Sequence, residues 1–205
     1  MQSFSNIKLF LLVTVFYFSN NTLFAQNLNY SQIENNLKKH ISFLSDDKLE
    51  GRLVGSKGEK IAADYISKEF KKNKITPKGT QGYLQPFSVK KNIVNPHGSD
   101  TDAHAVTIVG NNIVGFIDNK APYTVVIGAH YDHLGYNEFG SSTYRSENPN
   151  EKPQIHNGAD DNASGTAALI ELSRLLKNSS FKKNNYLFLA FSGEEEGLLG
   201  SNYYT

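Results

Sequence analysis

The chain contains no cysteine among its 205 residues, which excludes both a disulfide framework and metal sites built on thiolates. Any bound metal must therefore be held by His, Asp or Glu. Net charge is nearly absent as well, since 21 Lys and Arg stand against 20 Asp and Glu. Without a strongly basic surface, there is no electrostatic reason to expect nucleic acid or an anionic membrane as a partner.

Long apolar stretches are scarce, and the one present is LFLLVTVFYF at residues 9–18. It follows Lys8 and precedes the small-residue site NTLFAQ, which together are typical of a signal peptide cleaved after Ala25. The run is too short to span a bilayer. We predict a signal peptide at 1–25, export to the periplasm or the extracellular space, and no membrane association of residues 26–205. An uncleaved anchor is the alternative.

Two helices are predicted near the start of the mature chain. The first is indicated by apolar residues at helical spacing, namely Tyr30, Ile33, Leu37, Ile41 and Leu44. A capping box of Ser31 and Glu34 indicates where it begins. The second helix is predicted to begin at Ser56 with Glu59 and to end before Pro77.

Two strand candidates follow these helices. YLQPFSV at 83–89 alternates like a strand, and its Pro86 favours an edge position. NNIVGFI at 111–117 is the second candidate.

A βαβ unit is predicted in the second half of the chain. TVVIGA at 124–129 is apolar on both faces, as in sheets that are covered on both sides. SGTAALIELSRLLK at 164–177 has a helical pattern that puts Ala167, Ile170, Leu172 and Leu175 largely on one side, and NYLFLAF at 185–191 is another strand. The fold class is therefore α/β, with a mixed, largely parallel sheet flanked by helices.

Histidine, aspartate and glutamate residues, which can bind metals, follow both strands of this unit and also precede its helix. The segments are HYDHLG at 130–135, HNGADDNASG at 156–165 and SGEEEG at 192–197. Ligands gather at the carboxyl ends of the strands in such sheets, so we expect the three segments to converge on one edge. The three adjacent glutamates of the last segment repel one another unless a cation or a helix N-terminus compensates them.

Each segment also has a purely structural interpretation. His130 alone could be a buried histidine bonded to Asp132, and ADDNASG alone could cap a helix through Asn162 or Ser164. A calcium site on ADDNAS is a further alternative, although it would leave His130 without a role. These interpretations would have to hold independently at three strand-end positions, which favours a single metal site.

In this order the three motifs closely resemble the zinc-dependent aminopeptidases of the bacterial leucine aminopeptidase type. The wider family includes glutamate carboxypeptidase, glutaminyl cyclase and the non-enzymatic transferrin receptor. The resemblance implies a Zn²⁺ exopeptidase acting on peptides with a free N-terminus, with two ions in the complete site. DDKLEGRLVGSKGEKIAADYISKEF, at 46–70, is similar to the leading helices of the family.

Carried over by residue, the resemblance implies His130 and Glu195 as zinc ligands and Asp160 as a bridge between two ions. Asp132 would orient His130, and Glu194 would be the general base. Asp161 would support the bridge through a cis peptide bond to Asp160. Glu196 matches no functional position, and we expect it to face solvent.

The family needs two further ligands, an aspartate and a histidine, that lie later in its sequence than the point where this chain ends. We therefore interpret 26–205 as the N-terminal part of one zinc peptidase domain. A non-catalytic binding module, or a cyclase or carboxypeptidase of the same fold, remains as an alternative. His133 and His156 lie near the motifs, and local hydrogen bonding is the expected role of His133. Within the long segment after Asp132, Tyr144 and Arg145 are candidates for contacting substrate or for a solvated loop.

Overall fold

The computed structural model describes residues 28–93, 104–137 and 152–205. The elements follow in the order α2 (Tyr30–Leu44), the 3-10 helix η1 (Asp47–Arg52), α3 (Lys57–Lys72), β1 (Thr76–Pro77), β2 (Leu84–Ile93), β3 (His104–Ile117), β4 (Thr124–His130), the π-type turn η2 (Ala159–Ser164), α4 (Gly165–Asn178), β5 (Asn185–Phe191) and α5 (Leu199–Tyr204). The predicted helices and strands of the described part are all present, and the α/β class is confirmed.

One mixed sheet organises the fold, with its strands in the order β1-β3-β5-β4 and β2 paired to β3. β4 and β5 are parallel neighbours joined through α4, as the βαβ prediction requires. The pairings of β1, β2 and β5 with β3 are antiparallel, so the parallel share of the described strands is smaller than expected. Because β2 pairs with β3 alone among the described strands, the edge position expected from Pro86 is also confirmed.

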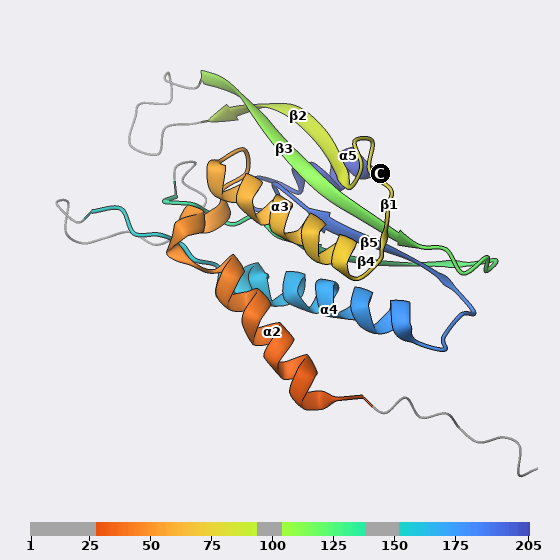
Figure 1. Ribbon diagram of the computed structural model, residues 1–205. Helices are drawn as coiled ribbons and strands as arrows, with labels where there is room; N and C mark the ends of the chain where they lie inside the picture. The colour runs from red at the N-terminus through yellow and green to blue at the C-terminus, as the bar shows by residue number, and fades with distance from the viewer. Residues whose placement is uncertain (1–27, 94–103, 138–151) are drawn as a thin grey trace, which may run out of the picture.

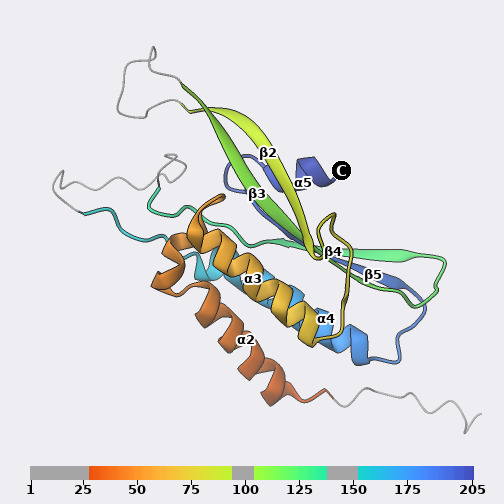
Figure 2. The same ribbon diagram turned by 45° about the horizontal axis from the view of Figure 1, so that its top comes forward.

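Helices α2, α3 and α4 lie together on one side of the sheet (Figures 1 and 2). Their apolar faces and the strands share one core, whose fully buried members include Leu44, Ile66, Phe70, Ile113, Ile170 and Phe188. The neighbouring β3 residue Asn112 faces the opposite side, where its amide donates to the Gly200 carbonyl of α5 at 2.8 Å. The core therefore holds the βαβ unit from one side while α5 caps the other.

The helix starts were only partly predicted. Ser56 caps α3, and its hydroxyl accepts from the Glu59 N–H at 3.1 Å, as expected. The cap of α2 is Asn29, whose side chain accepts from the Gln32 N–H at 3.0 Å, so the capping box at Ser31 was wrong. Asn and Ser are about equally good N-caps, so a Ser followed three residues later by Glu does not exclude a cap two residues earlier.

We expected both faces of β4 to be buried, and among the described residues they are not. Val125 is 40 % exposed and Val126 is 59 % exposed, although both belong to the apolar run. Within the described part of the chain, β4 is last in the strand order and pairs with β5 alone, and α4 packs against one of its faces. Apolar composition on both faces thus did not predict burial on both faces here.

Gly58 lets α3 approach η1 closely. A Cβ at this position would lie 1.7 Å from the Leu49 carbonyl oxygen, which is backbone and cannot move aside cheaply. Alanine normally favours a helix over glycine, yet Gly58→Ala is expected to destabilise the fold by about 3 kcal/mol through overpacking. Urea unfolding measures the difference, with exposed Lys60→Ala of the same helix as the control, expected to stay within about 0.5 kcal/mol. An unchanged or raised midpoint for Gly58→Ala would contradict the close approach.

No helix in the described ranges is long and apolar enough to cross a membrane. The signal peptide predicted at 1–25 lies outside the described residues, as do Tyr144 and Arg145.

Candidate metal centre

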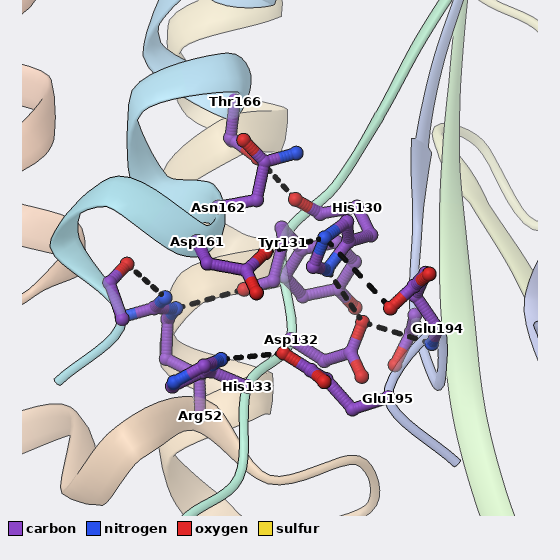
Figure 3. Close-up of polar contacts among 12 residues, drawn as sticks. Arg52, His130, Tyr131, Asp132, His133, Asp161, Asn162, Thr166, Glu194 and Glu195 are labelled. Carbon is purple, nitrogen blue, oxygen red and sulfur yellow. Dashed lines mark hydrogen bonds and ion pairs between the residues drawn. The ribbon is translucent and has the colours of Figure 1, made fainter. Parts of the chain in front are cut away.

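The three motifs meet at one edge of the sheet, as predicted (Figure 3). His130 ends β4, Glu194 and Glu195 follow β5, and Asp161 lies in η2 directly before α4. Because β4 and β5 are parallel and in register from Thr124 to His130, both strands deliver their loops to the same place. The Thr166 hydroxyl of α4 donates to the His130 carbonyl at 2.8 Å and ties this helix to the end of β4.

His130 lies at the centre of the cluster. Its Nε2 is 3.0 Å from Asp161 Oδ1 and 3.9 Å from Glu194 Oε2. His130, Glu194 and Glu195 each offer a donor atom, and these atoms lie within 4.8 Å of one another. This spacing is compatible with one ion bound by an imidazole and carboxylates.

A second group shares Glu195 and adds His133 and Asp161. Their donor atoms also lie within 4.8 Å of one another, and His133 Nδ1 is 2.6 Å from Glu195 Oε1. The local hydrogen bond expected of His133 is therefore present, but its partner is a residue expected to bind metal. The ring of His156 lies 6.3 Å from that of His133 and belongs to neither group.

The aspartate pair differs from the prediction by one residue. Asp161, rather than Asp160, brings its carboxylate to His130 and His133, and the cis peptide bond lies between Asp161 and Asn162. Asp160 is exposed and belongs to neither group, while its carbonyl accepts from the Ser164 hydroxyl at 2.7 Å. Adjacent side chains point in different directions, so one aspartate of a pair can enter the site while the other faces solvent.

Asp132 is completely buried beside His130 and holds the loop that follows β5. Its Oδ1 accepts from the Glu194 N–H at 3.2 Å and lies 3.7 Å from His130 Nδ1, an ion-pair distance. Asp132 Oδ2 and His130 Nδ1 have no hydrogen-bond partner among the described residues, which is unusual for buried polar atoms. Such a site favours a cation, which would compensate the carboxylates while Asp132 would orient His130.

The electrostatics of the cluster indicate the same deficit of positive charge. Burial, together with the neighbouring Asp161 and Asp132 carboxylates, raises the pKa of Glu195 to about 7. Burial alone would lower the pKa of His130, but the facing carboxylates, Asp132 foremost, raise it to about 9. Protons thus occupy positions where a divalent cation would take their place, and the residues present fit Zn²⁺.

Two buried charged residues near the site were not predicted. The Glu59 Oε1 atom of α3 accepts from the Tyr131 hydroxyl at 2.7 Å and from the Ser192 hydroxyl at 2.9 Å, and so joins the ends of β4 and β5. Burial raises the pKa of Glu59. Arg52 of η1 is fully buried and donates to the Tyr131 carbonyl at 2.8 Å. The surface-type composition of 46–60 gave no sign that either side chain would be inside.

Glu196 also departs from the prediction, because it is only 4 % exposed rather than solvent-facing. Gly193 and Gly197 on either side of the three glutamates have positive φ values of 73° and 103°. These turns leave the strand direction at once, so the alternation of β5 does not continue through the glutamates.

Comparison with known proteins shows what this site is similar to. The family model of Peptidase family M28 matches residues 112–205. The alkaline phosphatase isozyme conversion protein of Escherichia coli is 30 % identical over 151 residues, which are 74 % of this chain and 40 % of that protein. A probable zinc metalloprotease of Pyrenophora tritici-repentis is 31 % identical over 87 % of this chain and 33 % of its own length.

Solved structures share the fold at low sequence identity. A Zn-dependent exopeptidase from Parabacteroides distasonis has a TM-score of 0.55 at 17 % identity, over 83 % of this chain and 54 % of that one. Glutaminyl cyclase of Porphyromonas gingivalis gives the same TM-score, identity and coverage. The chain spans about half the length of these structures and less than half of the two relatives above. Residues 112–205, which carry all three motifs, match the model of Peptidase family M28.

Proposed function

We propose that this protein acts as a zinc-dependent aminopeptidase that hydrolyses N-terminal residues from peptides. The observation that carries the proposal is the convergence of His130, Asp161, Glu194 and Glu195 at one sheet edge. His130, Glu195 and Asp161 would hold zinc, with His133 as a further donor. When bound there, zinc lowers the pKa of a water molecule and polarises a carbonyl group.

Glu194 is the proposed general base. Its Oε2 lies 3.9 Å from His130 Nε2. The Glu194 side chain is 38 % exposed, so a water molecule and a substrate can reach it. Asp132 holds the Glu194 N–H and thereby the start of the loop. From this position Glu194 would accept the proton of the attacking water and transfer it to the leaving amine. The carboxylates would attract the positive α-amine of the peptide.

Metal content and substrate preference test the proposal together. The purified chain is expected to bind zinc and to hydrolyse leucine p-nitroanilide, but not its N-acetylated form. Hydrolysis of the blocked compound alone would exclude an aminopeptidase. Conversion of N-terminal glutamine to pyroglutamate with loss of ammonia would indicate a cyclase instead. Absence of zinc binding would contradict the metal site and leave the binding module as the better interpretation.

Zinc affinity is expected to rise steeply with pH. Zinc must displace a proton from His130 below about pH 9 and one from Glu195 below about pH 7. The pKa of His133 is lowered, chiefly by burial, so this residue adds no proton to displace near neutral pH. Affinity should therefore increase about 100-fold per pH unit below pH 7, about tenfold per unit from pH 7 to 9, and level off above that range.

Competition with a chromophoric chelator at fixed ionic strength measures this dependence, after correction for the chelator's own protonation. Release of protons into a weakly buffered solution on zinc addition provides an independent count of the displaced protons. A zinc affinity that is flat between pH 6 and 8 would show that zinc displaces a proton from neither His130 nor Glu195.

A further inference from the structure

Arg52 is the largest fully buried side chain of the described residues, and four carbonyl groups accept hydrogen bonds from its guanidinium. Its Nε donates to the Tyr131 carbonyl at 2.8 Å (Figure 3). Its Nη1 donates to the carbonyls of Leu44 and Asn157, the latter at 2.7 Å, and its Nη2 donates to the Gly158 carbonyl at 3.0 Å. The acceptors belong to the end of α2, the loop after β4 and the loop before η2.

Two of these three segments carry cluster residues. Tyr131 lies between His130 and His133, and Gly158 lies three residues before Asp161. The planar guanidinium fork bridges the two loops, whose main chains it holds at fixed separation. Its N–H groups thus donate to main-chain carbonyls of the two loops that carry His133 and Asp161.

The backbone around Arg52 reinforces the same contacts. Its carbonyl accepts from the His133 N–H at 3.3 Å, and the Gly51 carbonyl accepts from the Gly135 N–H at 3.1 Å. Gly51 has a φ of +67°, and a Cβ there would lie 2.6 Å from the His156 carbonyl oxygen. The turn therefore packs backbone against backbone on both loops, an approach that glycine alone permits.

The charge of Arg52 is buried without a direct anionic partner among the described residues, since no carboxylate lies within ion-pair distance. Burying an unpaired charge is costly, so its position calls for compensation. Burial lowers the pKa of Arg52 to about 10, while the charges of Asp132, Asp161 and Glu195 oppose that shift. The negative charges that favour the charged form of Arg52 are thus those of the cluster itself.

We infer that Arg52 is a positioning residue of the metal cluster, which fixes the His133 loop and the Asp161 turn relative to each other through its guanidinium. A role limited to ending α2 would need only the bond to Leu44. The bonds to Tyr131, Asn157 and Gly158 do not serve that helix. The inference about loop geometry is independent of the bound ligand, whereas its consequence for zinc rests on the proposed function.

Amide hydrogen exchange of the metal-free chain tests the inference with variants Arg52→Gln and Arg52→Lys. The amides of His133, Gly135, His156 and Ala163 are hydrogen-bonded within the bridged loops and report their opening. Arg52→Gln is expected to speed their exchange by about tenfold or more while amides of β3 and β5 stay protected. Arg52→Lys, which keeps the charge but not the fork, should be intermediate, and it decides the question alone if the Gln variant does not fold.

Asn73→Ala is the matched control, because it removes two hydrogen bonds from Asn73 to α4, at Ile170 and Ser173, at the other end of α3. It should lower stability without opening the bridged loops selectively. Zinc affinity is expected to fall by about 10- to 100-fold in Arg52→Gln, as for other residues that orient ligands, and not in Asn73→Ala.

Exchange that is unchanged in the bridged loops of Arg52→Lys, or faster only at the end of α2, would overturn the inference. If the unaltered chain binds no zinc, the proposed function fails while the exchange result still decides the role of Arg52.

Discussion

Turnover of leucine p-nitroanilide is expected to fall by about 10²- to 10⁴-fold in Glu194→Gln, the range by which a positioned general base contributes. The amide keeps the size of the carboxylate but cannot accept the proton of the attacking water. Zinc should still bind, because His130, Asp161, Glu195 and His133 retain their donor atoms. Activity measured at equal zinc loading therefore separates loss of the base from loss of the metal.

The same substitution two residues later provides the control. Glu196 lies in the same loop but in neither group of candidate ligands, so Glu196→Gln should keep turnover within about threefold, a change of under 1 kcal/mol in the barrier. Full turnover by zinc-loaded Glu194→Gln would remove Glu194 from the mechanism. A variant that lost zinc together with activity would show instead that Glu194 mainly serves as a ligand.

The fold was predictable where side-chain period and strand order determine it. The β4–α4–β5 unit follows from two apolar runs around a helical pattern, and parallel pairing then brings His130 and Glu195 to one edge. Burial within α4 was less predictable. Leu172 is 39 % exposed, whereas Thr166 and Ser173 are fully buried, because close packing selected the small side chains rather than the most apolar ones.

The residues that complete the site were not predictable from spacing. Asp161 and Asn162 have non-helical φ values of −111° and −132° inside η2, so no regular period describes which side chain points inward. His133 lies in the irregular loop after β4, and Arg52 ends η1 with a positive φ of 52°, so no regular period describes their directions either. Sequence patterns could identify the segments that carry the chemistry, but only the folded backbone could distinguish between neighbours within them.

Neighbouring aspartates therefore provide the sharpest test of the metal site. Asp161→Asn is expected to weaken zinc binding by on the order of 100-fold or more, since a direct donor matters at least as much as the residues that orient ligands. Asp161 Oδ1 lies 3.0 Å from His130 Nε2, and its carboxylate also belongs to the group of His133 and Glu195. The asparagine retains one neutral oxygen and loses the charge that compensates the ion.

Asp160→Asn is the matched control, with the same substitution one residue earlier on an exposed side chain outside both groups. Its zinc affinity should remain within about threefold of the unaltered chain, a difference of under 1 kcal/mol. Chelator competition on both variants, together with their thermal midpoints, measures the two effects side by side. The opposite result, with zinc lost from Asp160→Asn and kept by Asp161→Asn, would return the bridging role to Asp160. The loop around η2 would then have to rearrange when the metal binds, because only a different backbone could turn Asp160 inward.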